Sequence, residues 1–144
     1  MGFRINIEGK SETIELGTDC IEDVNYCSES ARDSAARSSD VCILLEVEGK
    51  IRISTEGEEV DEARKLAKWS LVSSEKADAY RDIVLEVISA DQVVRKVELP
   101  HAFVIDYIED FDEDEGLGHF DLVVKQKKDM NHLVTVEGGY AVEE

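Results

Sequence analysis

The chain has 144 residues, and its 16 Lys+Arg against 34 Asp+Glu give a formal net charge of −18. A hydrophobic fraction of 42% excludes a disordered acidic tail, which lacks the apolar surface needed to offset chain entropy. The length predicts one domain over residues 1–144 with an ordinary core. The charge argues against direct binding to nucleic acid or to anionic membranes, because both need Lys and Arg to neutralise phosphates.

No apolar segment follows Met1, and no window approaches the roughly 20 apolar residues of a membrane span. We therefore expect synthesis in the cytoplasm without a cleaved export signal. The three cysteines, Cys20, Cys27 and Cys42, form no Cys-x-x-Cys pair, and an odd number fits reduced thiols better than a disulfide framework.

Apolar residues at period two predict antiparallel strands through most of the chain. Ile5 and Ile7 share one face, and Ile14 and Leu16 continue the pattern after a turn at 8–10, which predicts an opening hairpin. The alternation over 41–47, with a turn at Gly49-Lys50 and a return through Ile51 and Ile53, predicts a second hairpin.

The segment 28–40 contains five serines and no large apolar residue, which predicts an extended loop. Loops of this length in compact domains are usually functional or disordered. Two interpretations stay open: a flexible hairpin tip, or an arm that orders against a partner.

One helix is predicted over 58–73. Residues 55–58 have the spacing of a capping box, acids crowd the start, and basic residues follow, as the helix dipole favours. An apolar stripe at helical spacing should plug an open sheet or barrel mouth; it consists of Val60, Ala63, Ala67 and Leu71, flanked by Leu66 and Trp69.

Five further strands are expected at 80–89, 93–99, 102–111, 120–127 and 133–136. Pro100 interrupts this pattern and predicts a bulge or a strand boundary. The fold class is therefore mainly β, an antiparallel β-barrel or β-sandwich of about eight strands with one packed α-helix.

The segment 109–118 is predicted to be an acidic loop, since six of the seven residues from 109 to 115 are Asp or Glu. Asp110, Asp112 and Asp114 match the first ligand positions of an EF-hand, but Glu115 stands where that loop needs glycine and Asp121 where it needs glutamate. We therefore predict no metal site, and expect either a solvated loop or a docking surface for a basic partner.

Enzyme signatures are missing from the sequence. The histidines, His101, His119 and His132, have no His-x-x-x-His spacing, and there is no Gly-x-Ser-x-Gly elbow or glycine-rich phosphate cradle. We predict no catalytic residues and no cofactor.

Residues 97–107, VELPHAFVIDY, followed by an acidic loop and by GHFDLVVKQK at 118–127, resemble the C-terminal half of tube-forming proteins. These are the contractile-phage tail tube proteins and the haemolysin-coregulated (Hcp) tube proteins of type VI secretion, in the version found in Gram-positive phage-like elements. The order of elements is similar too: N-terminal strands, a long loop, a hairpin, one helix and a final strand set.

This resemblance implies a β-barrel-like sandwich whose subunits form hexameric rings with sheets joined across the subunit boundary. The rings would stack into a hollow tube, with sheath and baseplate proteins as further partners and no catalysis. The protein would assemble in the cytoplasm and become part of a virion or injection particle. The loop 28–40 would dock on the adjacent ring, and 83–89 and 103–107 would help to form the lumen wall.

The candidate interface residues follow from this implied role. Arg32 and Arg37 lie on the predicted arm and could pair with the acidic residues Asp112, Glu113, Asp114 and Glu115 of the next ring, although two solvated arginines remain an equal alternative. A second function class also stays open: a monomeric acidic β-sandwich that binds a partner as a baseplate or accessory component, with cation binding as one option.

Overall fold

The structure is a computed structural model and describes residues 1–30, 41–52, 62–114 and 116–141. The strands in chain order are β1 (Gly2–Glu8), β2 (Thr13–Leu16), β3 (Ile21–Glu29), β4 (Cys42–Arg52), β5 (Arg81–Ser89), β6 (Gln92–Asp112), β7 (Leu117–Gln126), β8 (Thr135–Glu137) and β9 (Tyr140–Ala141). The described helices are α1 (Glu62–Ser70) and two short 3₁₀ turns, η1 (Ala77–Ala79) and η2 (Lys128–Leu133). None of them is long and apolar enough to cross a membrane. The mainly β prediction with one packed α-helix is confirmed.

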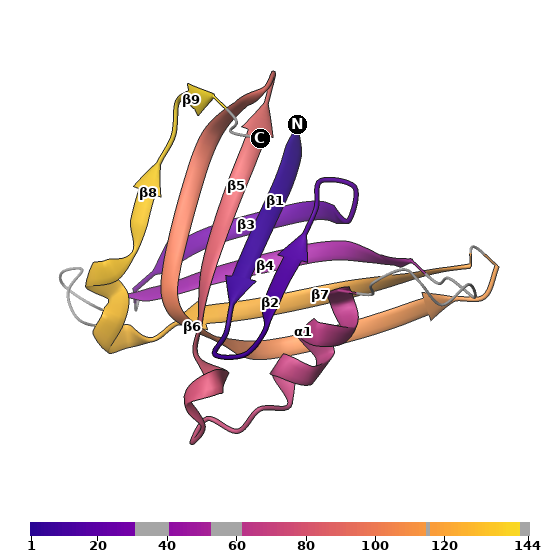
Figure 1. Cartoon of the computed structure of the whole chain (residues 1–144), viewed down its shortest axis with the longest axis horizontal. Helices are drawn as coiled ribbons and strands as arrows, with labels where there is room; N and C mark the ends of the chain where they lie inside the picture. The colour runs from indigo at the N-terminus through magenta and orange to yellow at the C-terminus, as the bar shows by residue number, and fades with distance from the viewer. Residues whose placement is uncertain (31–40, 53–61, 115, 142–144) are drawn as a thin grey trace.

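All nine strands belong to one antiparallel sheet that β6 divides into two halves. The order is β2-β1-β5-β6-β7-β4-β3, and β8 and β9 also pair with β6. Residues 92–99 of β6 pair with β5, residues 103–112 pair with β7, and Ala102 pairs with both. Figure 1 shows the two groups of strands crossing at a steep angle, with the bent β6 common to both. We call β2-β1-β5-β6(92–99) the first half-sheet and β6(102–112)-β7-β4-β3 the second.

Two irregularities on β6 accompany the change of direction. Pro100 and His101 form a bulge opposite β5, and His101 has a positive φ of 68°. A second bulge lies at Ile105, opposite β7. Bulges bend a strand and let it pass from one packed layer to another, so the predicted bulge at Pro100 is confirmed within a single long strand.

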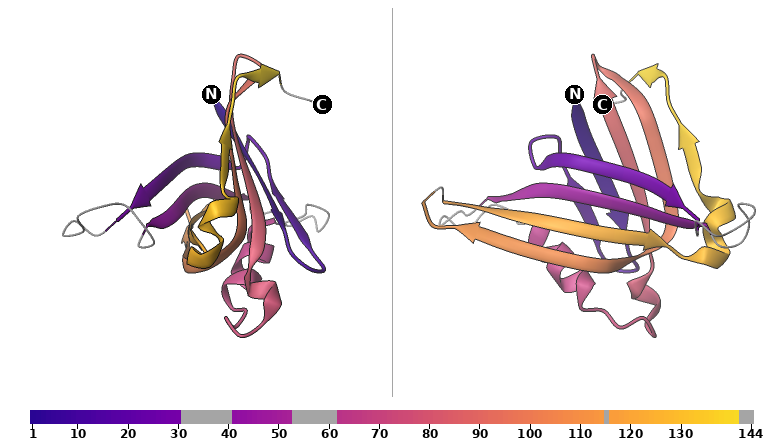
Figure 2. Two further views of the ribbon diagram at one scale, coloured as in Figure 1. Left: turned by 90° about the vertical axis from the view of Figure 1, so that its left-hand side faces the viewer. Right: turned by 180° about the vertical axis from the view of Figure 1, so that it is seen from behind.

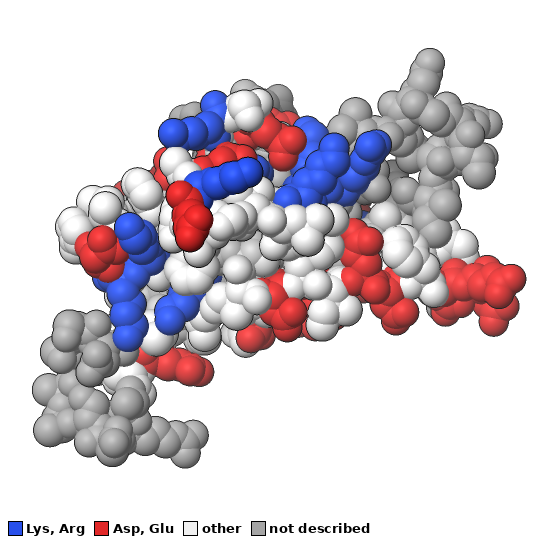
Figure 3. All heavy atoms as spheres, turned by 90° about the horizontal axis from the view of Figure 1, so that it is seen from below, with Lys and Arg blue, Asp and Glu red and all other residues white. Residues whose placement is uncertain are grey.

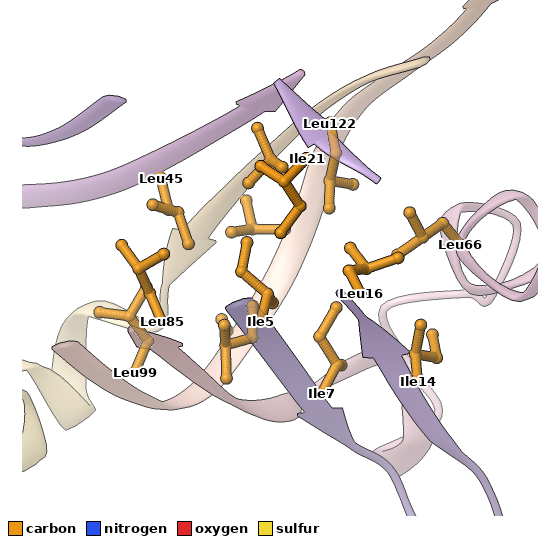
Figure 4. Packing of buried hydrophobic residues seen from close by; sticks show 14 of the residues in the cluster. Ile5, Ile7, Ile14, Leu16, Ile21, Leu45, Leu66, Leu85, Leu99 and Leu122 are labelled. Carbon is orange, nitrogen blue, oxygen red and sulfur yellow. The ribbon is translucent and has the colours of Figure 1, made fainter. Parts of the chain in front are cut away.

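The core lies between the half-sheets and is closed at one end by α1. Its buried residues come from both halves, among them Ile5, Ile7, Leu85, Leu45 and Leu122. Figure 4 shows Leu66 of α1 extending towards Leu16 and Ile14 of β2. The predicted plug is therefore present, but its buried residues are Ala63, Leu66 and Trp69.

The predicted helix end at residue 73 is wrong, because α1 ends at Ser70. Leu71, which the helical stripe placed in the core, is 85% exposed. The last turn tightens into i→i+3 bonds from Leu71 N to Lys68 O and from Val72 N to Trp69 O. The predicted start at 58 and the capping box lie outside the described residues.

The predicted turn at Gly49-Lys50 is also wrong, since β4 runs unbroken from Cys42 to Arg52. Gly49 pairs with Phe120 of β7, and a Cβ at position 49 would overlap the Phe120 ring. The glycine therefore provides room for an aromatic ring in the core instead of a reversal of the chain.

The predicted acidic loop 109–118 is shorter than expected. β6 continues to Asp112 and β7 begins at Leu117. The acids of β6 face non-acidic partners, Glu109 opposite Phe120 and Asp110 opposite His119. Strand pairing therefore places no like charges directly opposite one another here, which is why an acidic segment can extend the hairpin.

Candidate functional site

The second half-sheet has an edge without a strand partner on each side. Among the described residues β3 pairs only with β4, and β6 along 103–112 pairs only with β7. Both strands are long enough to template another strand through the backbone N–H and C=O groups that point away from the paired strand. In Figure 2 the four strands of this half-sheet run side by side. The two edges lie on opposite sides of it, so a neighbour can pair with each.

The outward face of the second half-sheet is dominated by carboxylates. The register places the side chains of one row on the same face, so we can follow them from strand to strand. The acidic residues on this face are Asp23, Glu29, Glu46, Glu48, Asp106, Asp110, Asp112 and Asp121, and the basic residues among its described side chains are Lys50, Lys125 and His119.

One row on this face brings three acids together. Asp121 of β7 lies opposite Glu48 of β4, and Glu48 lies opposite Asp23 of β3. All three side chains are exposed. Like charges directly opposite each other destabilise a sheet, so this row opposes folding of the isolated chain.

The outward face of the first half-sheet also carries more acids than bases, namely Glu8, Glu15, Asp82, Glu86, Glu98 and Glu137 against Arg4 and Lys96, but one of its rows is charge-balanced. This row runs Arg4, Glu86, Lys96 and Glu137 across β1, β5, β6 and β8, with charges that alternate in sign. Arg4 Nη2 lies 2.9 Å from Glu86 Oε1. Burial lowers the pKa of Lys96, but Tyr140, Glu98 and Glu86 outweigh this and leave it raised. Both outward faces are therefore acidic, and they differ in how charges pair: this row of the first half-sheet alternates in sign, whereas the row Asp23, Glu48 and Asp121 does not.

The tip of the β6–β7 hairpin is a tight acidic turn. The N–H of Asp114 donates to Asp112 Oδ1 at 2.9 Å, and the N–H of Gly116 donates to the Asp112 carbonyl at 3.1 Å. The side chains of Glu113 and Asp114 are exposed. Figure 3 shows acidic side chains gathered at the end of the molecule that carries this hairpin. Asp112 thus shapes the turn, and Glu113 and Asp114 present its charge.

The predicted interface residues are only partly within the described chain. Arg32, Arg37 and Glu115 lie outside the described residues, whereas Asp112, Glu113 and Asp114 form the hairpin tip. β3 ends at Glu29 opposite Cys42, at the far end of the second half-sheet from the tip. The described residues Glu29 and Cys42 therefore lie at the opposite end of the half-sheet from the acidic tip.

Sequence reasoning missed the two open edges and the residues along them. Cys27 lies on β3, on the acidic outward face, opposite Leu44. Burial raises the pKa of the Cys27 thiol, and the carboxylates of Glu29 and Glu46 raise it further. The period-two pattern predicted no strand over Ile21–Glu29 and does not identify the partners of the strands that it did predict, so neither edge could be found in it.

No described group of three or more His, Cys, Asp or Glu residues could hold a metal ion. The three cysteines form no disulfide in the described part of the chain and are half-buried. His119 Nδ1 lies 3.0 Å from Glu22 Oε1 near the outward face.

No protein-family model and no curated protein matches the sequence. Solved structures do match the fold over nearly the whole chain. Hcp1 from Flavobacterium johnsoniae is 14% identical with a TM-score of 0.55, and the match covers 97% of this chain and 99% of that one.

Chains from two larger assemblies match at similar levels. The sheath/tube terminator of the extracellular contractile injection system PVC is 11% identical with a TM-score of 0.52, covering 94% of this chain and 93% of that one. A chain of the anti-feeding prophage (AFP) baseplate, solved with six-fold symmetry, is 12% identical with a TM-score of 0.51, covering 95% and 93%. At these identities the likeness concerns the fold, and the chain has the Hcp-like tail tube fold.

Proposed function

We propose that this protein is the structural subunit of a ring-stacked tube in a phage tail or contractile injection system. The observation that carries the proposal is the second half-sheet with its two open edges, β3 on one side and β6(103–112) on the other. The two edges are different surfaces, so pairing one with the other is head-to-tail, and a fixed rotation closes such contacts into a ring. The role needs no catalysis.

Six subunits per ring is the number we propose. The six-fold symmetry of the AFP baseplate structure supports it, since a chain of that particle shares this fold. Pairing of β3 of one subunit with β6(103–112) of the next would join the second half-sheets of all the subunits into one continuous wall. Of the two segments expected to line the lumen, 103–107 lies in this wall and 83–89 lies in the first half-sheet.

The acidic outward face of the second half-sheet would line the lumen. Its row of opposed acids costs stability in the isolated chain. This cost is consistent with a functional charge, because an acidic wall would let negatively charged cargo pass through the tube without binding to it. The first half-sheet, whose row Arg4, Glu86, Lys96 and Glu137 alternates in sign, would then face outward, towards sheath and baseplate proteins. Assembly in the cytoplasm and incorporation into the particle follow from this role.

Stacking of rings would use the two ends of the second half-sheet. Head-to-tail stacking would bring the segment 31–40 of one ring to the acidic tip of the next, where Arg32 and Arg37 could pair with Glu113 and Asp114. Charge reversal of both arginines should leave rings intact and abolish tubes. Unchanged tubes in electron micrographs would rule out this contact.

Disulfide trapping tests the ring contact directly. Neighbouring strands lie about 4.8 Å apart, so Cys27 on β3 should come within bonding distance of a cysteine placed on the same face of β6. We would substitute Asp106, Ile108 or Asp110 singly by cysteine, with Cys20 and Cys42 replaced by serine. Copper(II) at alkaline pH supplies the oxidant and offsets the raised pKa of the Cys27 thiol.

At least one of these variants should give a ladder of crosslinked species that ends at the hexamer. Lys68→Cys on the exposed face of α1 is the matched control, because it lies on neither edge, and it should give no ladder. Failure of all three β6 positions would refute the strand pairing. A monomer at high concentration would instead favour the alternative, an acidic β-sandwich that binds a partner.

A further inference from the structure

The edge strand β2 is contacted by two side chains of α1. Glu62 Oε2 accepts a hydrogen bond from the backbone N–H of Glu15 at 3.0 Å, and Lys65 Nζ donates to the backbone carbonyl of Thr13 at 3.2 Å. The two side chains are also paired with each other, with Lys65 Nζ 3.1 Å from Glu62 Oε1. A carboxylate and an ammonium thus bind the backbone of the strand.

These contacts fall on the free side of the strand. In an antiparallel pair the N–H and C=O of one residue point to the same side, and the direction alternates from residue to residue. Thr13 and Glu15 are two residues apart, so their backbone groups point the same way, away from β1. A strand from another chain would use the same groups.

The apolar face of α1 holds the helix in place for these contacts. Leu66 and Trp69 are buried, and the Trp69 indole N–H donates to the Ala79 carbonyl at 3.0 Å. The Tyr107 hydroxyl lies 3.2 Å from the Ala63 carbonyl. The helix is therefore anchored from both half-sheets while its polar side chains reach over the edge of β2.

We propose that α1 guards the β2 edge against a second copy of this chain, through Glu62 and Lys65. The inference rests on the proposed function in one respect: a head-to-tail ring needs two usable edges, and a third would permit branched association. Among the described strands the remaining edges are short: β8 and β9, which are three and two residues long, and residues 2–4 of β1, with which β2 does not pair. With β2 closed, β3 and β6(103–112) are the long edges left for pairing.

The test compares the double variant Glu62→Ala/Lys65→Ala with the control Lys68→Ala. Alanine is a good helix former, so α1 should persist in both, which far-UV circular dichroism checks. Hydrogen exchange of the Glu15 amide should become about fivefold faster in the double variant, as loss of one ordinary hydrogen bond would give. The control, whose side chain is exposed on α1, should exchange like the wild type.

Sedimentation velocity supplies the second measurement. The double variant should form species larger and more heterogeneous than the wild-type assembly. Adding Glu15→Pro, which removes the N–H that a pairing strand would need, should restore the wild-type distribution. Unchanged exchange at Glu15, faster exchange without new association, or failure of the proline to restore the distribution would each overturn the guard role.

The guard and the proposed ring can fail separately. If the wild type forms no rings, the proposed function fails. Hydrogen exchange of the Glu15 amide and new association of the double variant still test whether α1 guards the β2 edge. If rings form and the double variant behaves like the control, the guard alone is refuted.

Discussion

Replacement of Gly49 by alanine should destabilise the protein markedly, although the sequence around it resembles a tolerant turn. A Cβ at this position would overlap the ring of Phe120 and lie 2.9 Å from the backbone carbonyl oxygen of Cys20. The ring can shift slightly within the core, but the carbonyl belongs to the backbone and cannot move away cheaply. The strain is therefore shared between a side chain and the main chain.

The expected magnitude follows from two opposed effects. Overpacking a core costs about 1–3 kcal/mol, and the backbone contact places this site at the upper end. Alanine also reduces the conformational entropy of the unfolded chain, which stabilises the folded state by about 0.4–1 kcal/mol. The net loss should be about 2 kcal/mol, or roughly 6–8 °C in Tm for a chain of this size.

Urea unfolding of a double-mutant cycle with Phe120→Leu tests the mechanism. Leucine removes the ring, so the cost of Gly49→Ala should fall by about half in the Phe120→Leu background, while the clash with the Cys20 carbonyl remains. A cost below about 0.5 kcal/mol for Gly49→Ala alone, or strict additivity of the two substitutions, would refute the close-approach explanation.

Three further outcomes can be checked on the same protein, and a fourth on its assembly. Trp69→Phe should cost about 1–3 kcal/mol in urea unfolding, because the Ala79 carbonyl loses its donor and the Arg81 guanidinium, 5.2 Å from the ring centroid, loses its better π partner. Burial raises the pKa of Asp78, but hydrogen bonds from Arg81 and from the Lys10 N–H outweigh it and lower the pKa overall. Its stabilising contribution is thus present above the ordinary Asp pKa of about 3.9 and lost as pH falls below it, so Asp78→Asn should flatten the fall in urea midpoint under acid conditions. Glu48→Thr should raise the free energy of unfolding by about 0.2–1 kcal/mol, most at low salt, since it removes the middle of three opposed acids. A variant as stable as the wild type at all salt concentrations would contradict repulsion within this row. Raising salt from about 0.05 to about 0.5 M should lengthen tubes by screening charge between subunits, and shorter or unchanged tubes in electron micrographs would count against electrostatic control.

The sequence by itself determined the fold class, because strand periodicity depends only on neighbouring residues. Ile5, Ile7, Ile14 and Leu16 alternate as a half-buried hairpin must, and β1 and β2 pair as expected. Pro100 lacks a backbone N–H, so its interruption of the ladder could be predicted locally too. The excess of acidic residues could also be read from the sequence, but the positions of these residues on the sheet could not.

Tertiary structure decided everything that depends on which strands are neighbours. Gly49 resembled a turn because local rules favour glycine there, and only Phe120, 71 residues further along the chain, explains it. The acids Asp23, Glu48 and Asp121 are distant in sequence and form one row through strand register. An open or a guarded edge is likewise a property of pairing between strands, because backbone groups are alike in every residue and only a partner distinguishes them.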